Sequence, residues 1–373
     1  MEKKKYIICL FVLICICFLL VGYFNYERII TFFNDREWEF AESFATIYKE
    51  NISQIETGNK ILVLTNNDLE LYGEETTSEY SQKMVTTGVI ANSCEEYMVV
   101  IIKDTNTICL FKEAELLWEK NLNWTILNAS VNKNGYVTII YSQSGYRSSI
   151  KIFKPSGEEL FTTHLGSTYA LDVEMSNDNK TLYIAEVDTE GIKIKSNIKI
   201  IEIAEVESTI NASPKTQIVF SRIDTVIIDI EYTNANKLLV LRESGIDAIE
   251  DKKEVKSISE FEIKNTLFSS VKTANYPVVI EKNSTGIFTN ETSLKIFKND
   301  EVIEVKLEKT PQNMDTMQDV IALNLGDEVI FFNMNGKIIK RYDLERQLVS
   351  VKLYNKAKFA ALIFRDRIEL IKL

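Results

Sequence analysis

Few residues of this 373-residue chain have side chains suited to catalysis. His164 is the only histidine, so a histidine-based triad or a multi-histidine metal site has almost no material. We interpret His164, at the end of an expected strand, as a packed or surface residue. Three of the five cysteines lie in an apolar run at residues 6–24, and the other two lack the spacing of a zinc or thioredoxin site. We expect Cys94 and Cys109 two strands apart, as two free buried thiols.

The remaining motifs give no catalytic or cofactor site. No phosphate-binding or dinucleotide-binding glycine pattern occurs in the sequence. The run SNDNK at Ser176–Lys180 resembles a loose calcium loop, but the bidentate glutamate of such a loop is not correctly placed, and we interpret it as a turn between strands. A carboxylate pair for glycoside hydrolysis is compatible with 54 acidic residues, yet nothing singles one out. We therefore predict no catalytic residue, no metal and no cofactor.

Three aromatic residues allow two interpretations. Trp118, Trp124 and Tyr141 are suited to a stacking platform for a carbohydrate or a quinone. Trp118, however, stands at a position that other copies of its phrase keep apolar, which favours core packing. Trp124 follows in a connection between strands, and its role stays open.

Composition and charge narrow the possible partners. The chain is 45% hydrophobic and 26% charged, which is typical of a globular protein with a sizeable core. Its formal net charge is −11. Binding to a phosphate backbone needs clustered lysine and arginine, so we expect no nucleic acid partner.

The first residues predict a membrane anchor. Residues 1–5, MEKKK, are basic, and residues 6–24 contain no charge. Nineteen residues in a helix rise about 28 Å, close to the hydrocarbon thickness of a bilayer. No small-residue cleavage site follows, so we predict an uncleaved transmembrane helix at 6–24 after a cytoplasmic tail at 1–5. A stalk at 25–38 and a domain outside the plasma membrane would follow.

A repeated hairpin phrase dominates the rest of the chain. Apolar runs flank a short turn in each copy, which indicates β-hairpins: IKIFKPSGEELFTTHL at Ile150–Leu165, ICLFKEAELLWEKNL at Ile108–Leu122, LKIFKNDEVIEVKL at Leu294–Leu307 and VIFFNMNGKIIKRYDL at Val329–Leu344. The phrase belongs to a unit of four strands, here called a, b, c and d, that recurs about every 42 residues, within the range of propeller blades. Weaker copies begin at Leu69 and Ile246.

The b strands predict how the units pack. ILVLT from Ile61, VTIIY from Val137 and FAALIF from Phe359 are apolar at nearly every position. A strand with one solvated face would alternate apolar and polar residues, so both faces must be covered. Radially packed blades cover both faces of their inner strands, whereas a two-layer sandwich covers one. We predict an all-β fold, a β-propeller at 39–373 with eight blades favoured and seven possible.

These phrases also carry a family resemblance. MSNDNKTLYIA at Met175–Ala185 resembles the a–b turn and b strand of WD40-like and TolB-like propellers, and the c–d phrases resemble blades of quinoprotein-type propellers. With its N-terminal anchor, the whole resembles an uncharacterised family of membrane-anchored, divergent propeller proteins of low-GC Gram-positive bacteria. The resemblance implies fold and location, and it implies no activity.

Two further expectations concern the ring. The last copy stops at Leu373 after its c strand, so we expect Glu39–Tyr48 to supply the missing d strand. We assign the long connections to the end of the blades where b–c and d–a loops lie: Ser142–Ser149, Glu186–Asn197, Ala204–Lys215, Lys282–Ser293 and Glu308–Thr316. We expect this end to point away from the bilayer, which would lie beneath the tight turns, and to present Tyr146, Arg147 and Phe288 as a binding face.

Two functional hypotheses remain. The first is a non-enzymatic, membrane-anchored propeller that binds a protein or a cell-envelope component as a scaffold or sensor. The second is an envelope enzyme, a glycan hydrolase or a quinoprotein-like dehydrogenase, that uses the central channel. Charged side chains converging at the ring axis would favour the enzyme, and a featureless channel would favour binding.

Overall fold

The computed structural model describes residues 39–40, 45–49, 51–203, 215–233, 235–252, 254–261, 263–273, 276–284, 290–298 and 301–373. Almost all regular structure in these residues is β, apart from the 3-10 turn η1 (Ile263–Asn265). No helix within these ranges is long and apolar enough to cross a membrane. The expected tail, transmembrane helix and stalk at 1–38 lie outside the described residues.

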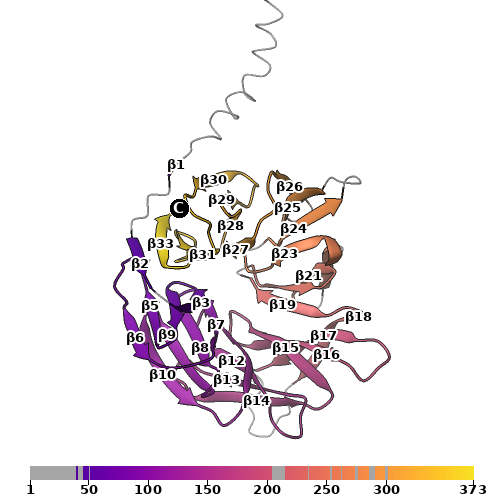
Figure 1. Ribbon diagram of the computed structural model, residues 1–373. Helices are drawn as coiled ribbons and strands as arrows, with labels where there is room; N and C mark the ends of the chain where they lie inside the picture. Colours follow the sequence, from indigo (N-terminus) through magenta and orange to yellow (C-terminus); the bar gives the residue numbers. More distant parts are fainter. Residues whose placement is uncertain are drawn as a thin grey trace, which may run out of the picture.

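The strands form eight sheets arranged in a ring, as Figure 1 shows. Each sheet is one blade, and its a strand lies nearest the axis. The first four blades follow the chain in order. They are β3 (Ile52–Thr57), β4 (Ile61–Thr65), β5 (Asp68–Tyr72) and β6 (Tyr80–Lys83); β7 (Val89–Cys94), β8 (Tyr97–Ile102), β9 (Thr107–Lys112) and β10 (Glu115–Asn121); β11 (Ile126–Val131), β12 (Val137–Tyr141), β13 (Ser148–Phe153) and β14 (Glu159–Leu165); and β15 (Thr168–Met175), β16 (Thr181–Asp188), β17 (Lys195–Glu202) and β18 (Thr216–Ile223).

The other four blades complete the ring. Blades 5 and 6 are β19 (Ile227–Tyr232), β20 (Lys237–Arg242), β21 (Gly245–Glu250) and β22 (Glu254–Glu260), then β23 (Thr266–Ser270), β24 (Val278–Ser284), β25 (Asn290–Lys298) and β26 (Glu301–Leu307). Blade 7 is β27 (Asn313–Met317), β28 (Val320–Asn324), β29 (Glu328–Asn333) and β30 (Ile338–Asp343), with β1 (Glu39–Phe40) at its edge. Blade 8 is β31 (Ser350–Tyr354), β32 (Phe359–Ile363), β33 (Arg367–Lys372) and β2 (Ala45–Tyr48). The prediction of an eight-bladed propeller is confirmed.

The b strands hold the blades together, as their composition predicted. Every residue of β4, β12 and β32 is buried. The apolar clusters are shared between neighbouring blades: Val99 of β8 packs in one cluster with Val137 and Ile139 of β12. Each blade therefore depends on its neighbours for the burial of its faces.

Asparagine-rich turns join blades 3 and 4 at the end where the a–b and c–d turns lie, here called the tight-turn end. Asn132 donates from Nδ2 to Oδ1 of Asn179 at 2.7 Å, and Asn134 donates to the same oxygen at 3.0 Å. Asn179 adopts a φ of 60°, a left-handed conformation that asparagine tolerates better than most residues. The predicted turn clusters thus also connect one blade to the next.

The ring closes through the N-terminal segment, but through less of it than expected. Within Glu39–Tyr48, β2 pairs antiparallel with β33, with Ile47 opposite Ile368, and supplies the d strand of blade 8. The two residues of β1 instead pair in parallel with β30 of blade 7. The expectation of one continuous strand was wrong here, because the start of the segment finds its backbone partners on the edge of blade 7.

One connection was assigned to the wrong end of the blades. Ala204–Lys215 follows the c strand β17 and precedes the d strand β18, so in chain order it is a c–d connection. Residues 204–214 themselves lie outside the described residues. The other four connections join b to c or d to a strands, at the end here called the loop end. All four are shorter than expected, because the flanking strands are longer. β13 begins at Ser148, β16 extends to Asp188 and β17 begins at Lys195. β24 extends to Ser284, β25 begins at Asn290 and β27 begins at Asn313.

Both cysteines of the described residues are free. Cys94 ends β7 and is half-buried, and Cys109 lies two strands over in β9 and is buried. The expected spacing and the free thiols are confirmed, but only Cys109 is fully buried. Burial raises the pKa of both thiols far above the usual range, which makes them poor nucleophiles.

Candidate functional site

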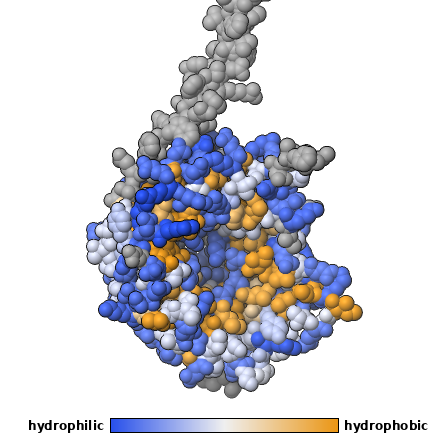
Figure 2. All heavy atoms as spheres, in the orientation of Figure 1, coloured by the Kyte–Doolittle hydropathy of each residue, from blue (hydrophilic) through white to orange (hydrophobic). Residues whose placement is uncertain are grey.

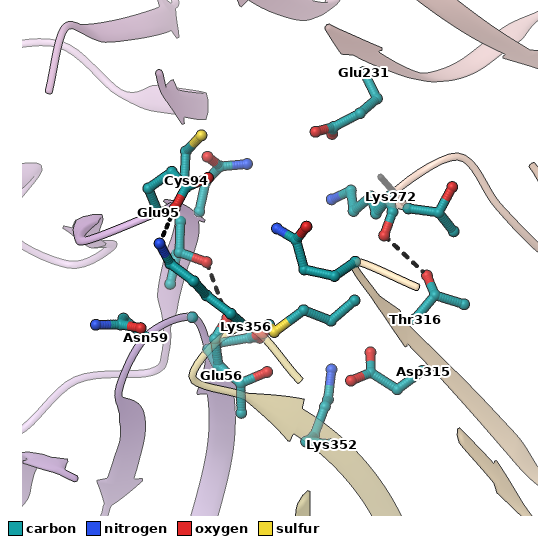
Figure 3. Close-up of a pocket in the computed structure, with 18 of the residues that line it drawn as sticks. Glu56, Asn59, Cys94, Glu95, Glu231, Lys272, Asp315, Thr316, Lys352 and Lys356 are labelled. Carbon is teal, nitrogen blue, oxygen red and sulfur yellow. Dashed lines mark hydrogen bonds and ion pairs between the residues drawn. The ribbon is translucent and has the colours of Figure 1, made fainter. Parts of the chain in front are cut away.

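A polar pocket of about 260 Å³ lies on the ring axis at the tight-turn end. Its lining residues come from the last positions of the inner a strands and from the turns that follow them, in blades 1, 2, 4, 5, 6, 7 and 8. Figure 3 shows charged side chains pointing into this space from several blades, among them Glu56, Glu231, Lys272, Asp315 and Lys352. The channel is therefore not featureless.

Two neighbouring inner strands supply most of the negative charge. β15 carries Asp172 and Glu174, and β19 carries Asp229 and Glu231. Residues two apart in a strand point to the same face, so each strand presents both carboxylates toward the axis while Val173 and Ile230 between them are buried in the blades. Lys272, which follows β23, lies with its Nζ 3.9 Å from Asp229 Oδ2.

Hydrogen bonds between blades fix some of these carboxylates in place. Asp172 Oδ1 accepts from Asn128 Nδ2 at 3.0 Å, and its Oδ2 accepts from the backbone N–H of Ile230 at 3.1 Å. Asp315 repeats the arrangement, accepting from the backbone N–H of Leu353 at 2.6 Å. These side chains connect adjacent inner strands, so Asp172 and Asp315 have a structural role as well as a place in the channel.

Glu174 and Glu231 differ from Asp172 and Asp315, which are hydrogen-bonded to neighbouring inner strands. Neither carboxylate accepts a hydrogen bond from any residue within the described ranges, and Glu231 lines the pocket. A buried carboxylate that accepts no hydrogen bond gains little stabilisation of its ionised form, so its pKa rises. Of the two, Glu231 lines the pocket and is therefore the group better placed to meet a ligand.

Burial, with a contribution from neighbouring negative charges, raises the pKa values of three carboxylates on β15 and β19. Burial, and then the negative charge of Asp229, raise the pKa of Asp172 to about 8. Burial also raises the pKa of Glu231 to about 7, against the opposing effect of Lys272, and it raises that of Glu174 well above its usual range. The charge of Asp229 is the main cause that raises the pKa of Lys272. The Lys272 side chain is 56% exposed, so channel water screens these interactions.

The side of the pocket formed by blades 7 and 8 carries both acidic and basic side chains. Burial raises the pKa of Asp315, while Lys352 on the next inner strand opposes that shift. At the mouth, Lys356 of blade 8 reaches Glu95 of blade 2, with 2.6 Å between Nζ and Oε2, as the dashed line in Figure 3 shows. The turn that carries Lys356 has three successive residues with positive φ, Asn355–Ala357. Such a run is uncommon outside glycine and holds the lysine over the pocket.

The residues predicted as a binding face lie elsewhere. Tyr146 and Arg147 are in the connection between β12 and β13, at the loop end, and Phe288 lies outside the described residues. The Tyr146 ring stacks on His164 at 4.3 Å between centroids. Arg147 donates from Nη1 to the hydroxyl of Tyr169 at 2.6 Å. The structure brings Tyr146 and Arg147 together on one surface, remote from the axial pocket.

The other singled-out residues are packed. Trp118 donates from Nε1 to the carbonyl of Pro155 at 3.0 Å, in the c–d turn of the next blade, and packs against the core there, as expected. Trp124 and Tyr141 do lie together, with ring centroids 4.9 Å apart, but Tyr141 is buried and Lys151 covers Trp124 at 4.9 Å. The three aromatic residues do not form one platform. His164 is exposed and bonded to Ser149 through Nδ1 at 2.9 Å.

The axial carboxylates were missed by the sequence analysis. A signal was present: LDVEM from Leu171 and IDIEY from Ile228 are both a strands that place two acidic residues two positions apart. An inner strand with one polar face must present that face to the channel. Gln54, Asn92 and Asn128 are polar residues at other inner-strand positions.

Comparison with known proteins agrees with the fold. A sequence model described as "Family of unknown function (DUF5711)" matches residues 36–373. No curated protein matches the sequence. Among solved structures, the Dos1 propeller superposes with a TM-score of 0.58 at 10% identity, covering 89% of this chain and 95% of that one. The C-terminal WD40 domain of Sif2 gives 0.52 at 12% identity, covering 90% and 96%.

An enzyme is also among these structural relatives. Dihydro-heme d1 dehydrogenase NirN superposes with a TM-score of 0.52 at 12% identity, covering 90% of this chain and 80% of that one. At such identities the likeness concerns the fold alone, because one propeller scaffold carries many functions.

Proposed function

The chain belongs to the DUF5711 family of unknown function, and from the geometry of its axial pocket we propose that it is a non-enzymatic binding module. In this proposal the propeller is anchored in the plasma membrane by residues 6–24 and stands outside the cell. Its tight-turn pocket binds a positively charged group, such as an amine, of a protein or cell-envelope component. The DUF5711 name assigns no activity, so the site carries the argument.

The observation that carries the proposal is a cluster of acidic side chains at and beside the pocket with a single lysine among them. Four carboxylates of β15 and β19 share one ammonium group, that of Lys272, and two of the four have no hydrogen-bond donor among the described residues. A second cation beside Glu231 would favour the ionised form of this carboxylate, which burial disfavours. The pocket volume, about 260 Å³, suits a side chain or small amine rather than a folded domain.

A thermal-shift experiment on the full chain in detergent tests this proposal. At pH 8 and low salt, 1,5-diaminopentane should raise the melting temperature by roughly 2–4 °C at saturation, because it binds the folded state alone. Glutarate, an anion of similar length, should not. The Glu231→Gln variant should lose most of the diamine effect, whereas Glu119→Gln, an exposed carboxylate on β10, should keep it. Equal shifts with diamine and glutarate, or an unchanged response in Glu231→Gln, would contradict the proposal.

One observation favours an enzyme as the second candidate. The pKa values of Glu231, about 7, and Asp172, about 8, lie near physiological pH, as a general acid requires. The carboxyl group of Glu231 also lines a pocket at the ring axis, and charged side chains at the axis were the feature expected of an envelope enzyme. Release of reducing sugar from purified cell wall by the full chain, lost in Glu231→Gln and kept in Glu119→Gln, would establish that activity in place of simple binding.

A further inference from the structure

The loop end of the channel is lined by hydrophobic side chains, whereas the pocket at the tight-turn end is lined by charged ones. Large exposed hydrophobic side chains surround its mouth: Leu127 is 52% exposed, Ile228 55%, Leu267 38% and Val349 53%. The first three lie in the innermost strands of blades 3, 5 and 6, and Val349 directly precedes that of blade 8. On the face drawn in Figure 2, hydrophobic residues border the central hollow of the ring. We call Leu127, Tyr169, Ile228, Leu267 and Val349 the apolar mouth.

A recurring backbone irregularity produces this arrangement. The pairing of β11, β19 and β23 with their b strands shifts by one residue, and the residues left unpaired are Leu127, Ile228 and Leu267. Such a bulge redirects a side chain that would otherwise follow the alternation of the strand. The bulges expose an aliphatic side chain at three equivalent positions of the ring. These residues therefore form one apolar patch and are not isolated exposed residues.

Rigid aromatic and arginine side chains continue the surface toward the rim. Tyr169 of the apolar mouth accepts the hydrogen bond from Arg147, whose guanidinium lies 5.2 Å from the Tyr169 ring centre. Tyr146 is 45% exposed and held against His164. Side chains already fixed in place lose little conformational entropy on binding, and tyrosine and arginine dominate many interfaces.

The charges of this face lie outside the apolar mouth and neutralise one another. Lys309 pairs with Asp327 at 2.7 Å, Arg346 with Asp366 at 3.6 Å, and Lys193 with Asp224. The described loop-end connections carry eight basic and eight acidic residues, against a chain total of −11. An apolar centre with a polar rim is the usual anatomy of a protein interface. An anionic membrane surface would call instead for an excess of lysine and arginine.

We propose that the apolar mouth, together with Tyr146 and Arg147, is a docking surface for a second protein that presents an uncharged, apolar segment. This surface is separate from the axial pocket and does not depend on its ligand. Under the proposed anchoring the loop ends of all copies point away from the same bilayer, so two copies cannot meet face to face through them. The neutral charge of the surface makes an apolar contact, rather than ionic attraction, the basis of recognition.

Photocrosslinking of the full chain in its native cells tests the proposal. The crosslinking amino acid p-benzoylphenylalanine replaces Ile228 or Leu267, and Lys133 on the tight-turn face serves as the control position, since its side chain is exposed. Both mouth positions should yield the same adduct with one other protein, and position 133 should not. Addition of Tyr169→Asp should reduce the adduct at least tenfold without changing the melting temperature.

The chemistry of the partner is tested after its identification by mass spectrometry. The affinity of the purified partner for the full chain should change less than about twofold between 50 and 500 mM NaCl, because exposed ionic contacts are screened over that range. A tenfold loss of affinity with salt would overturn the proposal. No adduct, an adduct equally strong from position 133, a crosslinked dimer of the chain itself or a lipid adduct would each overturn it as well.

Discussion

At the scale of single residues, Glu231 should make the protein less stable as the pH rises. Its pKa is raised to about 7, so the folded state binds a proton that the unfolded chain has already released between about pH 4.5 and 7. Stability therefore falls across that window, and the full penalty remains above pH 7. Glu231→Gln removes a charge that accepts no hydrogen bond from described residues, so it should raise the unfolding free energy at pH 8 by roughly 1 kcal/mol, limited by screening in the channel.

Denaturant unfolding of the full chain at pH 5 and pH 8 measures this effect. Glu119→Gln, on the exposed side of β10, is the matched control and should follow the wild type at both pH values. A Glu231→Gln variant that is destabilised at pH 8, or that keeps the pH dependence of the wild type, would show that Glu231 is charged and well compensated in the folded protein.

Predictability from sequence differed among residues for a physical reason. Trp118 and the two cysteines were correctly placed because their surroundings follow from the apolar pattern of their own strands. The convergence of Glu174 and Glu231 depends on two strands from different blades meeting at the axis. Nothing local distinguishes these two side chains among 54 acidic residues until the ring is closed.

At the scale of elements, β2 is the strand on which ring closure depends. Ile47 is 3% exposed and packs in one cluster with Ile61 of blade 1 and Ile368 of blade 8. Ile47→Ala should lower the unfolding free energy by about 2–4 kcal/mol, as truncation of a buried aliphatic side chain usually does. Tyr48→Ala, next along the strand and 76% exposed, should change it by less than about 0.5 kcal/mol.

Equilibrium unfolding of the two variants checks this contrast, and deletion of residues 39–48 should have a larger effect than either, since it removes a whole ladder and leaves an open edge. An unchanged melting temperature in the deletion would contradict closure through β2.

The elements themselves followed closely from sequence. The b strands that begin at Ile61, Val137 and Phe359 were predicted correctly, because a strand that is apolar at every position has few alternatives to burial between two sheets. The position of β1 and the end to which Ala204–Lys215 belongs were not, since short polar segments carry no periodicity that fixes their partners. The bulges that create the apolar mouth are also invisible in the sequence, because the unpaired residues Leu127, Ile228 and Leu267 look like ordinary strand residues.

At the scale of the whole molecule, the proposed topology makes a direct prediction. If residues 6–24 anchor the chain with its N-terminus inside, protease added to intact, wall-stripped cells should digest the propeller, which should otherwise remain with the membrane fraction. Antibodies against the propeller follow its digestion, and antibodies against a cytoplasmic marker show whether the cells stayed intact. Full protection of the propeller, with digestion only after lysis, would place it in the cytoplasm.

The two ends of the ring give the molecule two distinct surfaces. One end holds a charged pocket, and the other holds the apolar mouth with its paired rim charges. With the bilayer beneath the tight turns, as the sequence predicts, the pocket would face the membrane and the apolar mouth would face outward. In that arrangement the propeller would connect a component at the membrane surface to a protein further out.

Proton release on binding would show whether the carboxylates of raised pKa at the ring axis form a cation site. At pH 7, Glu231 and Asp172 are partly protonated, so a bound amine that favours their ionised forms must expel protons. Calorimetric titration of the full chain with 1,5-diaminopentane, in two buffers of different ionisation enthalpy, measures the number released. We expect net proton release at pH 7 that declines toward pH 9 and is reduced in Glu231→Gln. Binding without proton release, or no binding at all, would contradict it.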